Sequence, residues 1–409
     1  MDILLVSQYF PPEMGAPAAR AYENARRWVE MGHEVTVLCG VPNHPVGEVY
    51  EGYSNRPNQR EEIDGINVVR TWVYPTPNRK AWERIANYTS FGLSSLLGAI
   101  SVGKVDVVIG TSPQLLAGLS GYLIGRLKRV PFVFEVRDLW PESIEASGPT
   151  DNSLLLNTLD KISGFLYRRS DSIVVVTNSF KEEISARGIS SEKIKVVPNG
   201  VDLQFFNPEE TKEDGAIGEE LKGKFIVSYV GTMGAAHGLN VVLKVAERLE
   251  DQLTDLQFLF VGEGAKKEEL IEQKKSMGLG NVSFLDRQPK SRIPGILATS
   301  ELSLVLLKDR KVFRTVIPSK MFESMAMENP VILGVEGEAR GVLEEARAGL
   351  GIKPESVDEL EAAVVEMYQD RKKVVKMGKN GRKYVKENYS RTALARKYLD
   401  ILEELVQQS

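Results

Sequence analysis

The stretch TVIPSKMFESMAMENPVILG, residues 315–334, decides the fold class. A proline, a serine and a lysine precede a short apolar helix, and strand composition returns at NPVIL. Such a change from helix to strand is typical of a parallel sheet covered by helices. One glutamate, Glu323, lies among the methionines of the helix, and a basic loop precedes it. The stretch therefore raises a question about function as well as fold.

The same alternation continues on both sides of this stretch. Short β-branched runs alternate with helical stretches such as APAARAYENARRWVEMG, residues 16–32. The runs are almost continuously apolar, which indicates strands that are buried on both faces of a parallel sheet. We therefore expect an α/β protein with two doubly wound, Rossmann-like units. The expected strands are residues 3–7, 34–38, 66–71, 105–110, 132–136 and 172–177, followed by 225–231, 256–262, 281–285, 302–307 and 330–334.

The length of 409 residues favours two domains over a single core. The segment VVPNGVD, residues 196–202, and the polar residues after it separate the two series of strands and helices. We predict an N-terminal domain over residues 1–198, completed by the C-terminal helix at about 390–409, and a C-terminal domain over 199–389. Ligands of open α/β sheets bind beyond the carboxyl ends of the strands. The two sheets are therefore expected to face a central cleft.

Composition argues against several classes of protein. The net charge of -4 and the isoelectric point of about 5.8 argue against nucleic-acid binding. Cys39 is the only cysteine, which rules out an internal disulfide and favours a reducing, cytoplasmic setting. The N-terminus lacks the basic region of a signal peptide, and no apolar run has the length of a membrane span. The histidines show no metal-ligand spacing and no D-x-D pair occurs, so no metal or other cofactor is expected.

The segment that comes closest to a membrane span is YTSFGLSSLLGAISVG, residues 88–103. Two interpretations are open, because a short apolar stretch is either a buried helix on a sheet or a helix that touches lipid or an apolar acceptor. Trp82 and the basic residues Arg79, Lys80 and Arg84 lie just before it. They suit peripheral attachment to the inner face of a membrane.

Glycines follow three of the expected strands. Gly15 opens the helix at 16–32, where a phosphate can approach the N–H groups of a helix start; otherwise the glycine serves only the turn. Gly262, in VGEGAKKEEL, is open to the same two interpretations. VGTMGAAHGLN, residues 230–240, lacks the G-K-[ST] ending of a P-loop, which argues against an ATPase. His237 in this loop either binds phosphate or caps the next helix.

A basic loop, LKDRKVFRTVIPSK (residues 307–320), precedes the helix that contains Glu323. Basic runs are usually solvated surface. This one connects a strand to a helix at the carboxyl edge of a sheet, which suits a diphosphate. Glu323 can accept two hydroxyl hydrogen bonds, as a ribose diol requires, or it can favour the helix dipole. The residues placed to hold the diphosphate are Lys308, Arg314, Ser319 and Lys320.

A second polar segment, EVRDLWPES (residues 135–143), ends a strand of the first half. Arg137, Asp138, Trp140 and Glu142 lie close together in it. A polar and aromatic cluster of this kind suits sugar recognition or acid–base chemistry. The alternative is a structural salt bridge between Arg137 and a carboxylate.

Taken together, these motifs resemble the family-4 group of retaining, nucleotide-sugar-dependent glycosyltransferases with the GT-B fold. The resemblance covers essentially the whole chain, and PSKMFESMAMENPVIL is its most specific part. The combination of QYFPPE, RDLWPES and PSKMFE is similar to the bacterial and archaeal branch that builds surface polysaccharides and O-antigens, including N-acetyl-L-fucosamine transferases. This implies a metal-independent hexosyl- or N-acetylhexosaminyltransferase. Its donor would be a nucleotide sugar, with UDP favoured, and its acceptor a saccharide or a polyprenyl-linked sugar.

The resemblance implies roles for matching positions. Glu323 falls on the second glutamate of the family's E-x7-E motif and would bind the donor ribose. Ser319 and Lys320 fall on the loop and helix start that hold the diphosphate. The other matches are Gly262 and Arg287, near the nucleobase pocket, and Gly15, which would face the donor phosphate.

Two departures from the family's pattern concern the reacting sugar. Thr315 stands where the first glutamate of E-x7-E usually contacts the donor sugar. Arg137, beside Asp138, stands where the family usually has a histidine. We expect Asp138 or Glu13 to orient the acceptor hydroxyl.

A third departure concerns the diphosphate. Thr232 and His237 stand where an arginine and a lysine usually clamp it. We therefore expect Lys308, Arg314 or Lys320 to supply the missing positive charge.

Two other functions are compatible with these motifs. One is an epimerase of the same fold, similar to the UDP-N-acetylglucosamine 2-epimerases. The other is a protein that binds nucleotide sugars without catalysis. The segments VVPNGVD and PSKMFE favour the transferase.

Overall fold

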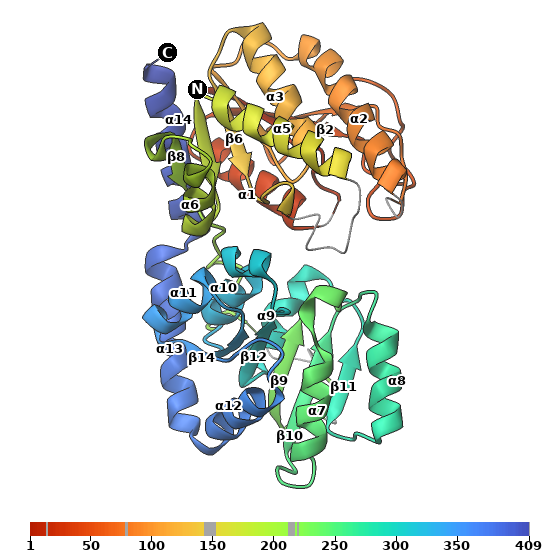
Figure 1. Cartoon of the computed structure of the whole chain (residues 1–409), viewed down its shortest axis with the longest axis vertical. Helices are drawn as coiled ribbons and strands as arrows, with labels where there is room; N and C mark the ends of the chain where they lie inside the picture. The colour runs from red at the N-terminus through yellow and green to blue at the C-terminus, as the bar shows by residue number, and fades with distance from the viewer. Residues whose placement is uncertain (14, 78–80, 143–152, 212–216, 219–220, 409) are drawn as a thin grey trace. The chain divides into compact units, whose positions relative to one another are not determined.

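The computed structural model describes residues 1–13, 15–77, 81–142, 153–211, 217–218 and 221–408. It divides the chain into two compact units, which we describe separately (Figure 1). The first unit is Met1–Pro198 together with Arg391–Ser409, and the second is Asn199–Ser390. In each unit, helices lie on the faces of a predominantly parallel sheet, so both units are α/β and Rossmann-like.

The sheet of the first unit has eight strands in the described part of the chain, in the order β3-β4-β2-β1-β5-β6-β7-β8. All neighbouring strands are parallel except β3 and β4. The central strands β5 and β6 are buried throughout, as parallel strands between two layers of helices require. The strands are β1 (Asp2–Val6), β2 (Glu34–Gly40), β3 (Gln59–Ile63), β4 (Ile66–Thr71), β5 (Val107–Thr111), β6 (Phe132–Val136), β7 (Ser172–Val175) and β8 (Ile194–Val196).

The helices of the first unit form two groups: α1 packs against α14, whereas α2 and α5 pack against α3. Trp28 of α1 meets Tyr398 of α14 edge to face, with 5.2 Å between ring centroids, and its indole N–H donates to the carbonyl of Ala395. The C-terminal helix thus completes the core of this unit. The helices are α1 (Ala16–Glu30), α2 (Ala81–Gly98), α3 (Leu115–Lys128), α5 (Ser153–Arg169), α6 (Asn178–Ala186) and α14 (Arg391–Gln407).

The sheet of the second unit has six strands in the residues that the structure describes, in the order β11-β10-β9-β12-β13-β14. All of its neighbouring strands are parallel. The strands are β9 (Phe225–Val230), β10 (Leu256–Val261), β11 (Val282–Leu285), β12 (Leu302–Leu306), β13 (Val331–Gly334) and β14 (Gly349–Gly351). The helices are α7 (Asn240–Leu249), α8 (Lys267–Met277), α9 (Ile293–Ala298), α10 (Ser319–Ala326), α11 (Glu338–Ala346), α12 (Val357–Gln369) and α13 (Arg371–Asn388).

The predicted doubly wound α/β class is confirmed, and each predicted strand is present with ends that differ by at most two residues. Three strands were missed. β3 has the sequence QREEI, whose charges suit its position as an exposed antiparallel edge strand. β8 and β14 have three residues each, too few to show an apolar period.

The order of the strands fixes where a ligand can bind. In the second unit the sheet grows from β9 towards β10 on one side and towards β12 on the other. Ligands of open α/β sheets bind outside the carboxyl ends of strands at such a switch point. The loop that begins at Gly231 follows β9, and the loop that begins at Leu307 follows β12. Both loops therefore lie at the carboxyl edge of the sheet, next to the switch point. In the first unit the corresponding point lies between β1 and β5.

Candidate functional site

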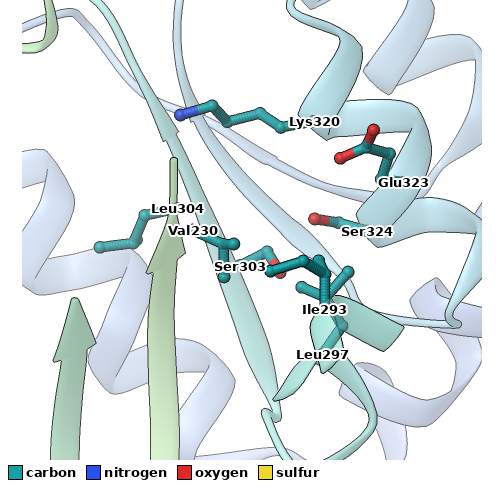
Figure 2. Close-up of a pocket in the computed structure, with 8 residues that line it drawn as sticks. All are labelled: Val230, Ile293, Leu297, Ser303, Leu304, Lys320, Glu323 and Ser324. Atoms are coloured by element: carbon teal, nitrogen blue, oxygen red, sulfur yellow. The ribbon is translucent and has the colours of Figure 1, made fainter. Parts of the chain in front are cut away.

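Lys320 connects the start of α10 with the end of β9. The helix begins directly after Pro318, which places Lys320 in its first turn. Its Nζ lies 4.0 Å from the centroid of the Tyr229 ring. A Cβ added at Gly231 would lie 2.8 Å from the same atom. Figure 2 shows the lysine reaching away from its helix, while the shorter Glu323 side chain stays beside the helix.

The ammonium group of Lys320 is poorly compensated. Burial lowers its pKa to about 8, and the nearby carboxylate of Glu323 acts in the opposite direction. Within the described part of the chain, the Nζ atom is buried and has no hydrogen-bond partner. Removing a charge from water is unfavourable unless an opposite charge or hydrogen bonds replace the lost solvation. The switch point therefore presents a buried positive charge that suits an anionic ligand.

The glycine loop after β9 brings a neutral imidazole towards this charge. His237 ends a short 3-10 helix, Ala235–His237, and its Nδ1 lies 3.3 Å from the backbone N of Gly234. Burial and the charge of Lys320 lower the pKa of His237 to about 4, so the ring is neutral near pH 7. The side chain of Thr232 is exposed in the same loop. The neutral ring carries no positive charge to replace the missing cation, and the predicted contact of His237 with a phosphate stays a prediction.

Two glycine loops of the second unit pack against each other through their backbones. Gly262 has a φ of 142°, and an added Cβ would lie 2.1 Å from the carbonyl oxygen of Gly231. Gly264 has a φ of 156°, and its added Cβ would lie 2.4 Å from the carbonyl oxygen of Met233. The glycines are therefore required by close packing of the two loops, which explains Gly262 without a ligand. Its predicted place near a nucleobase stays a prediction.

The basic side chains of the loop after β12 do not all lie beside the glycine loop. Arg314 forms an ion pair with Asp309 of the same loop at 3.0 Å, and both side chains are about half exposed. The hydroxyl of Thr315 donates to the carbonyl of Val312 at 2.8 Å. Lys308 is half-buried at the start of the loop. Of the three cations expected to replace the missing clamp, Lys320 is the one buried beside the glycine loop.

Glu323 lies one turn after Lys320, so both side chains project from the same side of α10. Below them is a small cavity of about 10 Å³, shown in Figure 2. The hydroxyl of Ser303 is buried and has no hydrogen-bond partner among the described residues. The cavity has room for a single water-sized group at most, so a larger ligand would have to lie above it. Its lining is Val230, Ile293, Leu297, Ser303, Leu304, Lys320, Glu323 and Ser324.

The loops expected near the nucleobase are held by a buried lysine. Lys267 of α8 pairs with Glu263 at 2.6 Å and with Asp286 at 2.5 Å, which ties the loops after β10 and β11 together. Arg287 follows Asp286 and is exposed. Its proposed contact with a nucleobase stays a prediction.

In the first unit, Arg137 and Asp138 lie directly after β6 and are half-buried. Their backbone N–H groups donate to the hydroxyl of Ser112, at 2.7 and 3.3 Å. The guanidinium of Arg137 donates to the carbonyl of Pro17 at 3.0 Å. Burial raises the pKa of Asp138 to about 6 and lowers that of Arg137 to about 10. Asp138 can therefore gain or lose a proton near neutral pH, as an acid–base group must.

The carboxylates around Arg137 have other arginine partners. Glu135 pairs with Arg20 of α1 at 3.0 Å, and Glu142 pairs with Arg187. These ion pairs tie the EVRDLWPES segment to Arg20 and Arg187, and the charges of Glu135 and Asp138 also act on Arg137. A salt bridge of Arg137 itself stays a prediction.

Glu13 is almost completely buried after β1. Its Oε1 accepts hydrogen bonds from the backbone N–H groups of Asn43, at 3.0 Å, and His44, at 2.9 Å. Burial raises its pKa to about 7. Gly15 precedes α1 with a φ of 147°, which favours glycine, and no side chain caps this helix start. Glu13 and Asp138, both in the first unit, thus have pKa values shifted towards neutrality.

Sequence reasoning did not identify several residues of these sites. Tyr229 was counted only as part of a strand, although its ring packs against Lys320. Asn43 and Asn87 are buried polar residues near Glu13. Asn87 lies in α2 among polar residues such as Arg84 and Thr89, so no local pattern marked it as buried. In the part of the chain that the structure describes, no group of three or more His, Cys, Asp or Glu residues is arranged to hold a metal ion.

Two doubly wound, Rossmann-like units are the architecture of a GT-B glycosyltransferase. Two family models match the chain: "Glycosyl transferase 4-like domain" over residues 15–200 and "Glycosyl transferases group 1" over residues 210–384. The chain belongs to the glycosyltransferases that these two models describe, and it is an enzyme of that class.

Relatives with curated names support the same class. The chain is 26% identical to the putative colanic acid biosynthesis glycosyl transferase WcaI of Escherichia coli, over 89% of this chain and 91% of WcaI. It is 24% identical to the sulfoquinovosyl transferase SQD2 of Arabidopsis thaliana, over 88% of this chain and 65% of SQD2. The narrower branch of N-acetyl-L-fucosamine transferases stays a prediction.

Solved structures show the same fold. Sucrose-phosphate synthase from Thermosynechococcus elongatus aligns with a TM-score of 0.76 at 16% identity, covering 100% of both chains. HepE from Anabaena, in complex with UDP, aligns with a TM-score of 0.73 at 16% identity, covering 99% of this chain and 100% of HepE. At these identities the likeness extends to the fold alone.

Proposed function

We propose that this glycosyltransferase is a retaining enzyme that takes a sugar from a UDP-linked donor. The second unit binds the donor, with the diphosphate beside Lys320 and the glycine loop and with the ribose hydroxyls on Glu323. The observation that carries the proposal is the buried ammonium of Lys320, which has no hydrogen-bond partner in the described residues. A diphosphate would supply both the negative charge and the hydrogen-bond acceptors that this group lacks.

The start of α10 adds to this anion site. Ser319 and Lys320 are its first two residues, and no side chain caps the helix. The first N–H groups of a helix have no partner inside the helix and carry part of its positive dipole. Phosphate oxygens accept such N–H groups readily. Backbone donors from α10 and the charge of Lys320 therefore serve the same ligand.

Glu323 is the partner we propose for the ribose. Its carboxylate lies one helical turn from the diphosphate site, and its charge supports the protonated form of Lys320. A carboxylate can accept one hydrogen bond from each of two adjacent hydroxyls. This arrangement would fix the nucleoside relative to the diphosphate.

The proposed reaction needs no covalent enzyme intermediate. The bond between the anomeric carbon and the donor phosphate breaks, and its electron pair stays on the phosphate. The acceptor oxygen bonds to the anomeric carbon on the same face, and its proton passes to the departing phosphate. Attack on that face retains the configuration of the sugar. The charge of Lys320 would stabilise the negative charge that develops on the leaving diphosphate.

UDP is favoured among the nucleotides because a structural neighbour, HepE, was solved with it. The acceptor is proposed to be a saccharide or a lipid-linked sugar of a surface polysaccharide, because WcaI is named for colanic acid biosynthesis. We propose that the first unit binds this acceptor. Asp138 is a candidate to orient the acceptor hydroxyl, because its pKa of about 6 lets it accept a hydrogen bond as a carboxylate near neutral pH. The predicted contact of Gly15 with the donor phosphate stays a prediction.

We also propose contact with a membrane surface through α2 and the short helix after it. Five large apolar residues form a stripe of exposed positions at helical spacing. Such a patch on a soluble fold usually marks an interaction surface, and the exposed Arg84 in its first turn would suit anionic lipid headgroups. The expected basic residues Arg79 and Lys80 lie outside the described residues. The stripe is Trp82, Ile85, Leu93, Leu97 and Ile100.

Among the helices of the described residues, none is long and apolar enough to cross a membrane. The apolar segment at 88–103 was interpreted either as a buried helix or as a helix that contacts lipid, and its residues are of both kinds. Phe91 and Ala99 are buried, whereas Leu93 and Leu97 are each 64% exposed. One face of the helix therefore belongs to the core and the other is available for contact.

Nucleotide binding tests the donor site directly. Isothermal titration should show that UDP binds the wild-type protein more tightly than ADP or GDP. Glu323→Gln should weaken UDP binding by about 10-fold, because a ribose contact of about 1.4 kcal/mol is lost. The same change at the exposed Glu272 is the matched control and should have no effect. Equal affinity of wild type and Glu323→Gln for UDP would remove Glu323 from the site.

A further inference from the structure

A connected network of buried polar side chains lies beyond β1 and β2 in the first unit. Gln8, Glu13, Asn43 and Asn87 are between 0 and 3% exposed. The Gln8 amide donates to Asn87 at 2.5 Å, and the Asn87 amide donates to the side chain of Asn43 at 3.5 Å. The backbone N–H of Asn43 in turn donates to Glu13. The network thus joins the loop after β1, which carries Gln8 and Glu13, to Asn43 after β2 and Asn87 of α2.

Three atoms on this network have no hydrogen-bond partner in the described part of the chain. They are Gln8 Oε1, Glu13 Oε2 and His44 Nδ1, and each of them is buried. An unsatisfied buried polar atom costs about 1–3 kcal/mol. Native folds contain few such atoms, and a group of them calls for a ligand or a functional explanation. Gln8 Oε1 can only accept, so its missing partner is a hydrogen-bond donor. Glu13 Oε2 and His44 Nδ1 can accept or donate according to their protonation, and the hydroxyl groups of a ligand can serve all three atoms.

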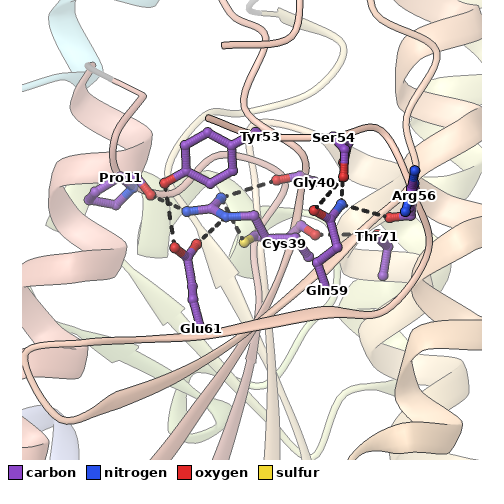
Figure 3. A network of polar contacts seen from close by, with 10 residues as sticks. Pro11, Cys39, Gly40, Tyr53, Ser54, Arg56, Gln59, Glu61 and Thr71 are labelled. Carbon is purple, nitrogen blue, oxygen red and sulfur yellow. Dashed lines mark hydrogen bonds and ion pairs between the residues drawn. The ribbon is translucent and has the colours of Figure 1, made fainter. Parts of the chain in front are cut away.

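A buried arginine, Arg70, holds the backbone beside this network. Figure 3 labels three of the residues that it contacts, Pro11, Gly40 and Glu61. Arg70 of β4 donates to the carbonyl of Gly40, at the end of β2, at 3.3 Å, and to the carbonyl of Pro11. It also pairs with Glu61. Pro11 lies between Gln8 and Glu13, so Arg70 fixes the loop that carries both of them.

The same arginine limits the chemistry of the ligand. Its guanidinium is anchored to the loop of Glu13, and it already favours the charged form of that carboxyl. A metal ion or another cation would be repelled by Arg70 and would find only one carboxylate in the network. A neutral ligand with several O–H groups meets neither difficulty. Carboxylate and amide oxygens side by side are well suited to neighbouring hydroxyls.

We infer that Gln8, Glu13 and His44 form a subsite that binds the hydroxyl groups of a pyranose, the acceptor sugar in the proposed function on which this inference rests. Glu13 Oε1 is fixed by two backbone N–H groups, so the direction of Oε2 is set before the sugar binds. Gln8 is fixed by Asn87 in the same way. Arg70 is a positioning residue, because it acts through the loop.

Saturation-transfer NMR on the full-length chain tests the subsite without knowledge of the natural acceptor. The probes are methyl α-D-glucopyranoside, methyl α-D-galactopyranoside and methyl N-acetyl-β-D-glucosaminide, with a monodeoxy derivative for each ring hydroxyl. We expect at least one glycoside to bind the wild type. At least one of its deoxy derivatives should bind about 10-fold more weakly, as the loss of a hydrogen bond to a buried polar group predicts.

The variants are Glu13→Gln and Gln8→Leu, with Glu48→Gln, an exposed glutamate, as the matched control. Either variant should weaken glycoside binding by about 10-fold and abolish the discrimination against the deoxy derivative. A purely structural role would not remove that discrimination while binding persists. UDP-induced thermal stabilisation of the same samples shows whether each variant is folded. If one variant does not fold, glycoside binding by the other variant tests the subsite.

Two results would overturn the inference: no glycoside binds the wild type, or both variants bind and discriminate as the wild type does. Failure of the proposed donor site would appear separately, as the absence of UDP binding by the wild type. Glycoside binding without UDP binding would leave the subsite standing and remove the donor proposal.

Discussion

The Nζ of Lys320 lies 4.0 Å from the centroid of the Tyr229 ring, so a buried cation rests on an aromatic face. The ring provides partial compensation, because its face carries negative electrostatic potential. A cation–π contact does not replace a hydrogen-bonded counterion, and the pKa of Lys320 is still lowered to about 8 by burial. This incomplete compensation is the reason why we propose an anionic ligand beside Lys320.

The first prediction concerns Lys320→Met, which keeps the length of the side chain and removes its charge. Since burial lowers the pKa from 10.5 to about 8, the charged lysine destabilises the folded state at pH 7. The variant should be more stable than the wild type by up to about 3 kcal/mol. It should also bind UDP at least about 10-fold more weakly. Urea unfolding and calorimetric titration measure the two effects.

The stability that Lys320→Met gains over the wild type should depend on pH in a definite direction. The penalty is fully present below pH 8, where the lysine is charged in both states, and it disappears as the pH rises from about 8 to 10.5. The stability difference between variant and wild type should shrink over that range. Lys311→Met, at an exposed lysine of the same loop, should change neither stability nor UDP binding. Unchanged UDP affinity in Lys320→Met would remove this lysine from the donor site.

The second prediction concerns the stability of Glu13→Gln. Burial raises the pKa of Glu13 from 4.5 to about 7, so its protonated form fits the fold. The protonated carboxyl of Glu13 stabilises the folded state fully below pH 4.5, and this stabilisation is lost as the pH rises through 7. Glutamine stays neutral, so the variant should match the wild type near pH 4.5 and exceed its stability at pH 8 by up to about 3 kcal/mol.

Thermal unfolding at the two pH values checks this expectation, with Glu48→Gln as the exposed control. A stability difference that is the same at pH 4.5 and pH 8 would contradict the raised pKa of Glu13. If the gain at pH 8 is observed, the native glutamate is retained at a loss of stability, as is common for functional residues.

The third prediction concerns the contact between the two glycine loops. Gly262→Ala places a Cβ 2.1 Å from the carbonyl oxygen of Gly231 and forces a φ of 142° on alanine. We expect a loss of at least about 2 kcal/mol in the free energy of unfolding, and weaker UDP binding as the loop beside Lys320 shifts. Gly341→Ala, in α11 with no atom near the added Cβ, should be neutral or slightly stabilising. Equal effects of the two changes would refute the packing argument.

Sequence patterns predicted the strands that lie between helices, because burial on both faces leaves a continuous apolar run. They failed for β3, whose sequence QREEI is set by its place at the edge of the sheet. The spacing in PSKMFE also placed Lys320 and Glu323 on one helix, since helical periodicity is local. It did not show which basic residue replaces the missing clamp. The folded chain shows only that Lys320 lies beside Tyr229 and Gly231, and its role as the replacement stays a proposal.

Glu13 illustrates the same limit in the first unit. Glu13 was expected to orient the acceptor hydroxyl, but nothing local revealed its burial. The donors to its Oε1 come from Asn43 and His44, after the next strand of the sheet. Its raised pKa is therefore a property of the assembled sheet edge.

The last prediction concerns the exposed stripe on α2. Insertion of a leucine side chain into the lipid interface contributes about 1.5–3 kcal/mol when burial is complete. Loss of both Leu93 and Leu97 should therefore weaken membrane binding by at least about 10-fold, even if each is only partly inserted. The test is cosedimentation of wild type and Leu93→Ser/Leu97→Ser with vesicles of phosphatidylglycerol and phosphatidylcholine. UDP binding should be unchanged in the variant, because α2 belongs to the first unit.

Leu154→Ser, at an exposed leucine of α5 outside the stripe, is the matched control. It should bind vesicles as the wild type does. Omission of phosphatidylglycerol should also weaken binding of the wild type, since Arg84 would lose its anionic partner. A wild-type protein that remains in the supernatant with anionic vesicles would contradict membrane contact. Equal losses in the double variant and in Leu154→Ser would show that binding follows surface hydrophobicity in general and not the stripe on α2.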